Sequence, residues 1–285
     1  MDSTITDGEA HSNQIAYWNG PGGAAWVAQQ AHTDAMLAPV AAALIAHAAP
    51  QPGERVLDIG CGCGATSLAL AERIGDGHVT GLDVSAPMLA VAAGRGSDPA
   101  RLTWLCADAA AHAFPKAGFD LLTSRFGVMF FGDPTAAFAN LRRAVRPGGR
   151  LAFACWRSPA ENPWMAVPLA AAAPHLPESP PTDPTAPGPF AFADPARVTR
   201  ILTAAGWSAP RLTPVDLLLD LAAGGGLDSA VAQMKQIGAA ARALREQPPE
   251  VVQAALDAVR AALRPHVDGA AVRLRGGIWL VSADA

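Results

Sequence analysis

Between residues 55 and 156, short apolar runs alternate with segments of helical spacing, and this alternation restricts the fold more than any other feature of the chain. The runs are apolar throughout, as strands are when helices cover both faces of a sheet. Strands that alternate with helices form parallel βαβ units with right-handed crossovers. The sequence therefore predicts an α/β fold with a mostly parallel sheet. The expected strands are 55–59, 78–82, 102–106, 119–124 and 150–156, and the expected helices are 65–74, 86–94 and 134–145.

The flanking segments are less regular. Residues 1–13 predict a loose tail, whereas residues 24–48 have the apolar spacing of a helix. Seven prolines between Pro174 and Pro189 exclude a helix or a central strand there. The remaining expected elements are the helices 162–173, 194–205, 228–245 and 250–263 and the strands 211–221 and 271–281.

The composition narrows the class of protein further. The chain has 285 residues, of which 51% are hydrophobic and 16% charged, and this excludes intrinsic disorder. Its net charge of −4 argues against a dedicated nucleic-acid binder, which normally shows a basic face. No apolar stretch reaches the roughly 18–20 residues of a membrane span. The N-terminus is polar and acidic, unlike a secretory signal, so we expect a cytoplasmic protein.

The chain has four cysteines, and Cys61 and Cys63 form a C-x-C pair. A metal site needs further Cys or His ligands that this pair lacks, so we expect no metal. Three of the four cysteines lie in or beside apolar runs, which predicts buried thiols in a reducing compartment.

The most informative segment is the glycine-rich turn of residues 56–64, with the sequence Val-Leu-Asp-Ile-Gly-Cys-Gly-Cys-Gly. It joins the expected strand 55–59 to the expected helix 65–74. Glycines at alternate positions permit a tight turn and let a ligand lie against the backbone. The start of the following helix offers N–H groups without helical partners. A tight turn of this kind needs no ligand, but the acidic residues that accompany it favour a ligand site.

Asp58 indicates which ligand the turn accepts. Gly60, Gly62 and Ala65 match the G-x-G-x-x-A spacing of a dinucleotide site, so an NAD-dependent oxidoreductase is one interpretation. A carboxylate at the end of the strand would repel a pyrophosphate and attract a cation. S-adenosylmethionine (SAM) carries an ammonium and a sulfonium and has no phosphate. Asp58 therefore favours SAM over a dinucleotide.

Three further residues extend this site along the sheet. Asp83 ends the second expected strand, at a position where an acidic residue binds ribose hydroxyls. Met88 lies one helical turn further on and is placed to cover the adenine. Asp108 follows the third expected strand and is placed to accept a hydrogen bond from the adenine amino group.

Together these segments resemble the class I SAM-dependent methyltransferases, and most of all the small-molecule branch related to ubiquinone and menaquinone biosynthesis. The resemblance covers residues 56–156 and rests on the ordered motifs D-I-G-C-G-C-G, L-D-V-S-A-P-M-L, C-A-D-A, F-D-L-L-T-S-R-F and L-R-R-A-V-R-P-G-G-R-L. It implies a Rossmann-like sheet of seven strands with helices on both faces. The last strand is antiparallel in this family, and residues 271–281 are the candidate for it.

The same resemblance implies SAM as the cofactor and S-adenosylhomocysteine as its product. The glycine turn would line the methionine part of SAM, and the residues after the fourth strand would lie beside the cofactor. The implied cofactor-binding residues are Asp58, Gly60, Cys61, Gly62, Gly64, Asp83, Val84, Met88, Asp108, Ala109 and Arg125, with Ser124 beside them.

The resemblance also suggests four parts of the chain. Residues 1–50 are the N-terminal tail and a lid helix, and residues 51–157 are the SAM-binding core. Residues 158–193 are a proline-rich insertion on the substrate side, and residues 194–285 are the remainder of the core with the C-terminal helices and the last strand. Aromatic residues in or beside the two covering parts are candidates for substrate contact, although simple packing would also explain them. They are Tyr17, Trp18, Trp26, Trp156, Trp164 and Phe190.

No catalytic base is evident, and the candidates are Tyr17, His32 and Arg125. Arg125 is compatible with a salt bridge, with the cofactor carboxylate and with an anionic substrate. We predict transfer of a methyl group from SAM to an O, N, S or C atom of a small, partly apolar metabolite. The alternatives are the NAD-dependent oxidoreductase and a non-catalytic SAM-binding protein. We expect no nucleic-acid or membrane partner, and helices 228–263 leave a homodimer open.

Overall fold

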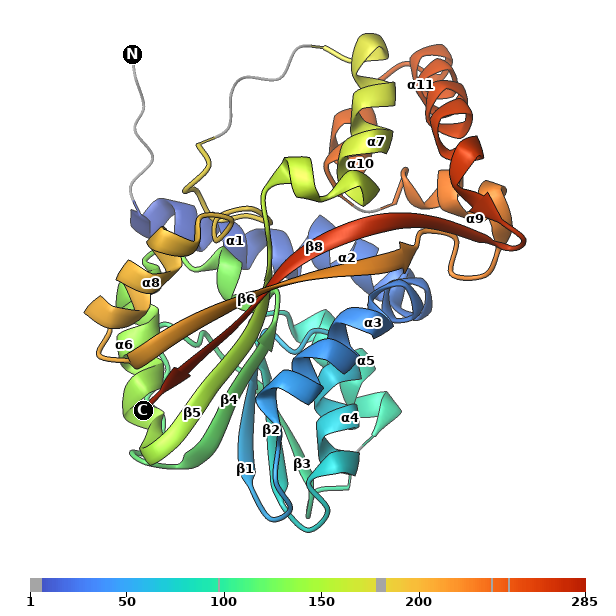
Figure 1. The fold of residues 1–285 in the computed structure, drawn as a ribbon. Coiled ribbons are helices and arrows are strands. Elements are labelled where there is room, and N and C mark those ends of the chain that lie inside the picture. The colour runs from blue at the N-terminus through green and yellow to red at the C-terminus, as the bar shows by residue number, and fades with distance from the viewer. Residues whose placement is uncertain (1–6, 97, 178–182, 237, 246) are drawn as a thin grey trace.

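A single twisted sheet runs through the middle of the protein (Figure 1). The structure is a computed structural model that describes residues 7–96, 98–177, 183–236, 238–245 and 247–285. Seven strands lie in the order β3-β2-β1-β4-β5-β8-β6, and the short strand β7 pairs with β8. The strands are β1 (Arg55–Ile59), β2 (His78–Asp83), β3 (Leu102–Cys106), β4 (Phe119–Arg125), β5 (Val145–Trp156), β6 (Ser208–Asp220), β7 (Val267–Asp268) and β8 (Ala271–Asp284).

Strands β1 to β5 are parallel to one another, and β8 runs antiparallel between β5 and β6. This arrangement confirms the predicted fold class, including the antiparallel terminal strand. β5 is longer than expected because its ladder with β4 already begins at Val145, where the register shifts.

Helices cover both faces of the sheet, as predicted. One face carries α3 (Gln30–Ala48), α4 (Ala65–Arg73) and α5 (Ala86–Arg95), and the other carries α6 (Pro134–Ala144) and α8 (Pro195–Ala204) (Figure 1). Between the layers lie fully buried apolar side chains such as Leu57, Leu122 and Phe153. Because the strands are apolar on both faces, they bury side chains against both helix layers at once.

The N-terminal segment differs from the predicted loose tail. Residues 7–13 belong to the helix α1 (Asp7–Asn19), so the prediction is wrong for them, and residues 1–6 lie outside the described residues. Tertiary contacts hold this helix: Asn19 donates to the Val84 carbonyl at 2.9 Å and accepts from the Ala86 N–H at 3.1 Å. The first two turns of α1 are almost entirely polar, so they carry no apolar stripe that a sequence pattern could reveal.

Two of the expected helices are each divided into two. The expected helix 24–48 is α2 (Pro21–Ala28) and α3, which meet at Gln29. The expected helix 228–245 is α9 (Gly226–Gln233) and α10 (Gly238–Leu244). Gly238 has a φ of 94°, in the left-handed region that a helix interior excludes, and this explains the second break.

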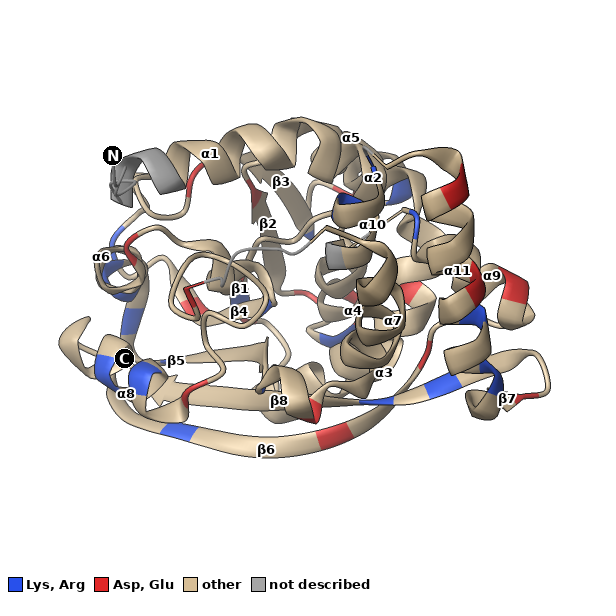
Figure 2. Ribbon diagram, turned by 90° about the horizontal axis from the view of Figure 1, so that it is seen from above, with Lys and Arg blue, Asp and Glu red and all other residues tan. Residues whose placement is uncertain are grey.

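A cluster of helices stands beyond the sheet at one end of β6 and β8 (Figures 1 and 2). It contains α7 (Pro163–Ala172) from the insertion together with α9, α10 and α11 (Pro249–Leu263). Its buried residues include Ala172, Val259 and Leu263. The structure therefore joins the expected insertion to the C-terminal helices, although they are far apart in the sequence. The described residues also form the 3₁₀ turns η1 (Gly127–Phe130), η2 (Pro159–Glu161), η3 (Ala173–His175) and η4 (Arg264–His266).

The charged residues are mixed in sign along the two strands β6 and β8, as Figure 2 shows. Ion pairs there join Arg211 to Asp284 at 3.5 Å and Arg275 to Asp216 at 3.9 Å. None of the helices in the described part of the chain combines the length and apolarity that a membrane crossing requires.

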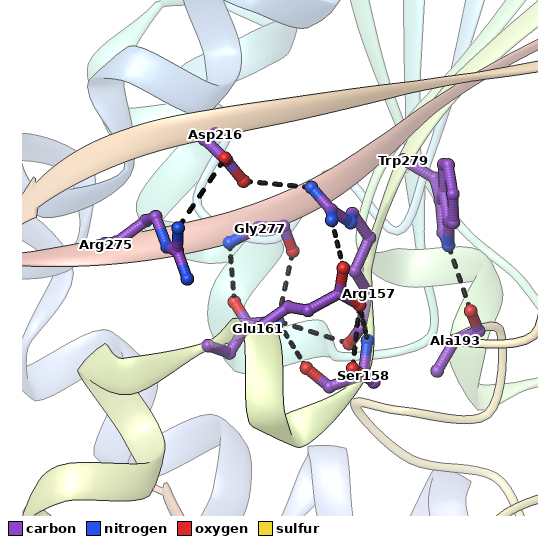
Figure 3. A network of polar contacts seen from close by, with 9 residues as sticks. Arg157, Ser158, Glu161, Ala193, Asp216, Arg275, Gly277 and Trp279 are labelled. Carbon is purple, nitrogen blue, oxygen red and sulfur yellow. Dashed lines mark hydrogen bonds and ion pairs between the residues drawn. The ribbon is translucent and has the colours of Figure 1, made fainter.

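A polar network fixes the point where the chain leaves β5 for the helical cluster (Figure 3). The guanidinium of Arg157 donates to Asp216 at 2.9 Å and pairs with Glu161. Its carbon lies 5.4 Å from the centre of the Trp279 ring, within the range of a cation–π contact. The side chain of Glu161 in turn accepts from the Ser158 hydroxyl at 2.7 Å.

Asn162 is the buried centre of the same joint, with no exposed surface. Its amide nitrogen lies 3.1 Å from the Gly277 carbonyl and also donates to the carbonyls of Arg157 and Ser158. Its amide oxygen accepts from the Gly277 N–H at 3.0 Å and from the Trp164 indole at 3.1 Å. This one side chain therefore ties the start of α7 to the middle of β8.

We expect Asn162→Ala to lower the free energy of unfolding by at least about 2 kcal/mol, because it leaves buried N–H and carbonyl groups without partners. Urea unfolding measures the change. The control is Gln253→Ala, which removes an exposed side chain that donates to exposed Asp257 at 3.0 Å and should change stability by less than about 0.5 kcal/mol. If both variants unfold at the same urea concentration, Asn162 does not hold the joint.

Candidate functional site

The glycine turn lies at the carboxyl end of β1, in the middle of the sheet. Gly60, Gly62 and Gly64 all have positive φ, at 66°, 56° and 85°, which L side chains adopt only with strain. The N–H groups of residues 60 and 61 both donate to the Leu82 carbonyl, at 2.8 and 3.0 Å. A Cβ atom added at Gly60 would lie 2.7 Å from the Cα of Gly127, so no side chain fits there. The turn is thus fastened to the end of β2 and lies against the segment after β4.

Asp58 lies beneath this turn, with an exposed fraction of 1%. Its two carboxylate oxygens accept from the hydroxyls of Ser67 on α4, at 2.6 Å, and Thr123 on β4, at 3.1 Å. Burial raises the pKa of the carboxyl to about 6, and these hydrogen bonds and the charge of Arg125 oppose the rise. The carboxylate is therefore enclosed, and its charge acts on the neighbouring glycine turn across a medium of low dielectric.

Asp83 ends β2 and binds the turn directly. One carboxylate oxygen accepts from the Gly62 N–H at 2.8 Å, and the other accepts from the Ser85 N–H at 2.8 Å. Burial raises the pKa of this carboxyl too, and the N–H donors oppose the rise. Each oxygen of an ionised carboxylate has about two acceptor positions, so both oxygens keep capacity for a further donor.

Asp108 follows β3 and has a partner that the sequence analysis missed. Its carboxylate accepts from the Ala110 N–H at 2.9 Å and lies 2.8 Å from Nε2 of His11 on α1. The next residue, Ala109, is buried, and its carbonyl accepts from Asn140 at 3.0 Å. No pattern in the sequence around His11 reveals this contact, because it depends on where α1 crosses the sheet.

Met88 and Trp26 flank the turn from the side of α5 and α2. A Cβ atom added at Gly62 would lie 3.8 Å from the Met88 sulfur and 3.9 Å from the Trp26 indole nitrogen. Met88 is buried, whereas Val84 is half-buried and uses its carbonyl to accept from Asn19 of α1. The structure thus brings one of the predicted substrate aromatics, Trp26, to the glycine turn.

Arg125 ends β4 and lies in a charged cluster whose other members the sequence analysis did not identify. Its side chain is 10% exposed, and its Nη2 lies 4.0 Å from Asp34 of α3. Asp34 also pairs with Arg95 at 2.8 Å, and Arg95 donates to the Cys63 carbonyl at 2.7 Å. One signal was available: Asp34 is the only acidic residue between Pro21 and Pro50, in an otherwise apolar and alanine-rich segment.

The two cysteines of the turn are buried thiols. Burial raises the pKa of both, to about 11 for Cys63, so they are protonated at neutral pH. In the described part of the chain, no group of three or more His, Cys, Asp and Glu side chains is arranged to hold a metal ion.

The predicted substrate aromatics fall into two separate groups. Trp18 is the centre of the first and makes edge contacts with Tyr17 and Phe130, both at 5.2 Å, and with Trp26 at 6.2 Å. The ring of Tyr17 also packs over Gly22, where an added Cβ would overlap it. This group links α1 and α2 to the η1 turn after β4.

The second group lies at the end of β5. Trp156 stacks on Phe126 at 4.1 Å and contacts Trp164 at 4.9 Å. Phe126 has a φ of 72°, which is an outlier for a bulky residue, and this conformation directs the chain from Arg125 into η1. Phe190 packs against the core as a partly buried residue.

His32, a candidate base, already has a partner. Its Nε2 lies 2.9 Å from the Leu221 carbonyl. A carbonyl only accepts hydrogen bonds, so Nε2 carries the proton and Nδ1 is the nitrogen that can accept one in the neutral ring.

Comparison with known proteins agrees with this geometry. Residues 56–149 match the family described as the methyltransferase domain. The chain is 38% identical to nocamycin O-methyltransferase from Saccharothrix syringae over 120 residues. This alignment covers 40% of this chain and 41% of that protein. The chain is also 42% identical to demethylmenaquinone methyltransferase from Thermus thermophilus over 101 residues. This alignment covers 34% of this chain and 45% of that protein. The matched part thus spans less than half the length of each relative.

Among solved structures, phosphoethanolamine N-methyltransferase 2 from Haemonchus contortus, in complex with phosphomonomethylethanolamine and S-adenosylhomocysteine, has a TM-score of 0.53 and 19% identity. The match covers 86% of this chain and 52% of that chain, and at this identity it shows a shared fold. Residues 56–149 therefore correspond to a methyltransferase domain, and the sheet that they help to form is Rossmann-like. The resemblance to class I SAM-dependent methyltransferases that the sequence motifs indicated is confirmed.

The raised pKa of Asp58 predicts how the stability of the protein depends on pH, and this dependence tests whether the carboxyl is buried. The folded state holds the proton up to a pKa of about 6, whereas the unfolded chain loses it near 3.8, so ionisation removes stability as the pH rises between these values. The full difference is about 3 kcal/mol, at 1.36 kcal/mol for each pKa unit. We expect the stability of Asp58→Asn relative to wild type to rise by up to about this amount from pH 4 to pH 8.

Urea unfolding at pH 4, 6 and 8 measures this change. Asp257→Asn is the matched control, because Asp257 is exposed and its substitution should leave the pH dependence as in wild type. A constant difference between Asp58→Asn and wild type at all three pH values would contradict the assigned burial of the charge.

Proposed function

We propose that this protein binds SAM along the carboxyl ends of β3, β2, β1 and β4 and transfers its methyl group to an O, N, S or C atom of a small, partly apolar metabolite. The observation that carries the proposal is the placement of Asp108, Asp83 and the glycine turn on successive strands of the sheet. These are the positions at which the family resemblance puts the adenine, the ribose and the methionine part of SAM.

The residues present fit such a cofactor. Asp83 is held by two backbone N–H groups and keeps acceptor capacity for the two ribose hydroxyls. Asp34, Asp58 and Asp83 together with Arg95 and Arg125 give a formal charge of −1, which complements the net charge of +1 on SAM. A dinucleotide would bring two negative phosphates to the same place. The net negative charge of these five residues would repel the phosphates, so it favours SAM over the NAD-dependent alternative.

SAM would supply an electrophilic methyl group on its sulfonium, so the protein's own contribution is binding, orientation and exclusion of water. The aromatic group of Trp18, Trp26 and Phe130 lies beside the turn and suits the last of these tasks. His32 is a candidate base through its Nδ1, because its other nitrogen is fixed as a donor. Tyr17 and the group of Trp156 and Trp164 remain candidate contacts for the acceptor.

The relatives' names support a small acceptor. One is an O-methyltransferase named for nocamycin and another a methyltransferase named for demethylmenaquinone. A non-catalytic SAM-binding protein is the remaining alternative, because a fold alone does not prove turnover. A cytoplasmic location, a homodimer and the four-part division of the chain stay predictions.

A thermal-shift comparison of S-adenosylhomocysteine and NAD tests the choice of cofactor. At about 100 times its dissociation constant a ligand stabilises the folded state by roughly 2.7 kcal/mol, which raises the melting temperature by several degrees in a chain of this size. We expect this rise with S-adenosylhomocysteine and no rise with NAD. A shift with NAD alone would replace the proposal with the oxidoreductase.

Substitution of Asp83 tests the ribose contact. We expect Asp83→Ala to weaken S-adenosylhomocysteine at least tenfold, because each charge-assisted hydrogen bond contributes roughly 1.5–3 kcal/mol. Isothermal titration calorimetry measures the affinity. The control is Asp76→Ala, which removes an exposed acid from the loop between α4 and β2 and should leave the affinity unchanged within error. An unaltered affinity in Asp83→Ala would show that the ribose binds elsewhere.

A further inference from the structure

The guanidinium of Arg125 is the most incompletely paired charged group at the site. Its side chain is nine-tenths buried, and its Nη1 has no hydrogen-bond partner among the described residues. The nearest carboxylate, Asp34, is 4.0 Å from Nη2 and is already paired at 2.8 Å with Arg95 and at 2.5 Å with Gln30. A buried cation without a hydrogen-bonded anion is costly, so this arrangement points to an anionic partner that arrives with a ligand.

The strand order indicates which part of the ligand supplies the anionic group that pairs with Arg125. Along the carboxyl edge, Asp108 follows β3, Asp83 ends β2, the glycine turn follows β1 and Arg125 ends β4, and these strands are adjacent in this order. The groups of SAM follow one another in the order adenine, ribose, sulfonium and amino-acid end. If the adenine lies by Asp108 and the ribose by Asp83, the amino-acid end passes the turn and reaches β4.

We propose that Arg125 binds the carboxylate of the cofactor's amino-acid end and so selects cofactors that carry this carboxylate, an inference that rests on the proposed function. A guanidinium suits the task because its planar N–H fork matches the two oxygens of a carboxylate. Asp34 lies on one side of Arg125 at 4.0 Å, and its closer ion pair is with Arg95 at 2.8 Å, so it leaves Arg125 available to a ligand. An acidic methyl acceptor is the competing source of an anion.

The experiment compares two ligands that differ only in the carboxylate. They are S-adenosylhomocysteine and its decarboxylated analogue, 5′-deoxy-5′-(3-aminopropylthio)adenosine, which keeps the adenine, the ribose, the sulfur and the ammonium. Both are titrated calorimetrically into wild type, Arg125→Gln, Arg125→Lys and Arg95→Gln, and circular dichroism checks the fold of each. The two ligands and the variants form a double cycle that isolates the contact between Arg125 and the carboxylate.

In wild type we expect the analogue to bind at least tenfold more weakly than S-adenosylhomocysteine, as for loss of a charge-assisted hydrogen bond. Arg125→Gln should weaken S-adenosylhomocysteine at least tenfold and leave the analogue within about twofold, so the preference for the carboxylate disappears. Arg125→Lys should keep part of the preference, because an ammonium retains the charge without the fork. Arg95→Gln removes the same charge from the same cluster and should retain the preference.

Several results would overturn the proposal. They are equal affinity of wild type for both ligands, equal loss of both ligands in Arg125→Gln, or loss of the preference in Arg95→Gln, which would implicate net charge. Unchanged binding of both ligands by Arg125→Gln would assign Arg125 to an acidic acceptor instead. If Arg125→Gln does not fold, the proposal is tested by the affinities of wild type and Arg125→Lys for the two ligands. Wild type that binds neither ligand would refute the proposed function itself, whereas the other results leave SAM binding intact.

Discussion

The structure of the site depends on the hydrogen bonds that fasten the glycine turn of β1 to the end of β2. The Leu82 carbonyl accepts from two N–H groups of the turn, and the Asp83 carboxylate accepts from a third. These bonds place backbone N–H and carbonyl groups of two strands within one small surface, and the close approach of Gly60 to Gly127 adds β4 to it. A side chain at residue 60 would force these segments apart, so the turn cannot form at this edge of the sheet without glycine there.

The parallel half of the sheet could be predicted from the sequence because its signals are local. Each of its strands is an apolar run bounded by turn residues, and each helix between them has its own spacing. The N-terminal helix could not be predicted in the same way. Residues such as Asn19 and His11 stabilise α1 only through contacts with Val84, Ala86 and Asp108, far away in the sequence. The helical cluster has the same origin, since α7 finds its partner in α11 about 80 residues later.

In the candidate site, too, local sequence signals identified some residues, whereas contacts between distant segments could not be predicted. Asp58, Asp83 and Asp108 were identifiable because each lies at or just after the carboxyl end of a strand, and parallel strands end at a common edge. The surroundings of these acids were not identifiable. The sequence indicated the place of Asp58 at the end of a strand, and only the structure reveals that it is enclosed between Ser67 and Thr123. The cluster of Asp34, Arg95 and Arg125 draws on three distant segments, and only the isolation of Asp34 in an apolar helix hinted at it.

The order of the strands has a consequence for how such a protein diversifies. Every strand that borders the proposed nucleoside edge comes from one continuous stretch, residues 55–125, whereas β6, β8 and the helices at their end are closed by pairings between remote segments. A lineage can therefore inherit the first stretch as a unit and exchange or remodel the second without disturbing it. The family match described above agrees with this pattern, because it covers residues 56–149 and ends before β6 and β8 begin. Under the proposed function, new acceptor chemistry would then arise by variation in the helical cluster, while the proposed SAM-binding edge stays as it was.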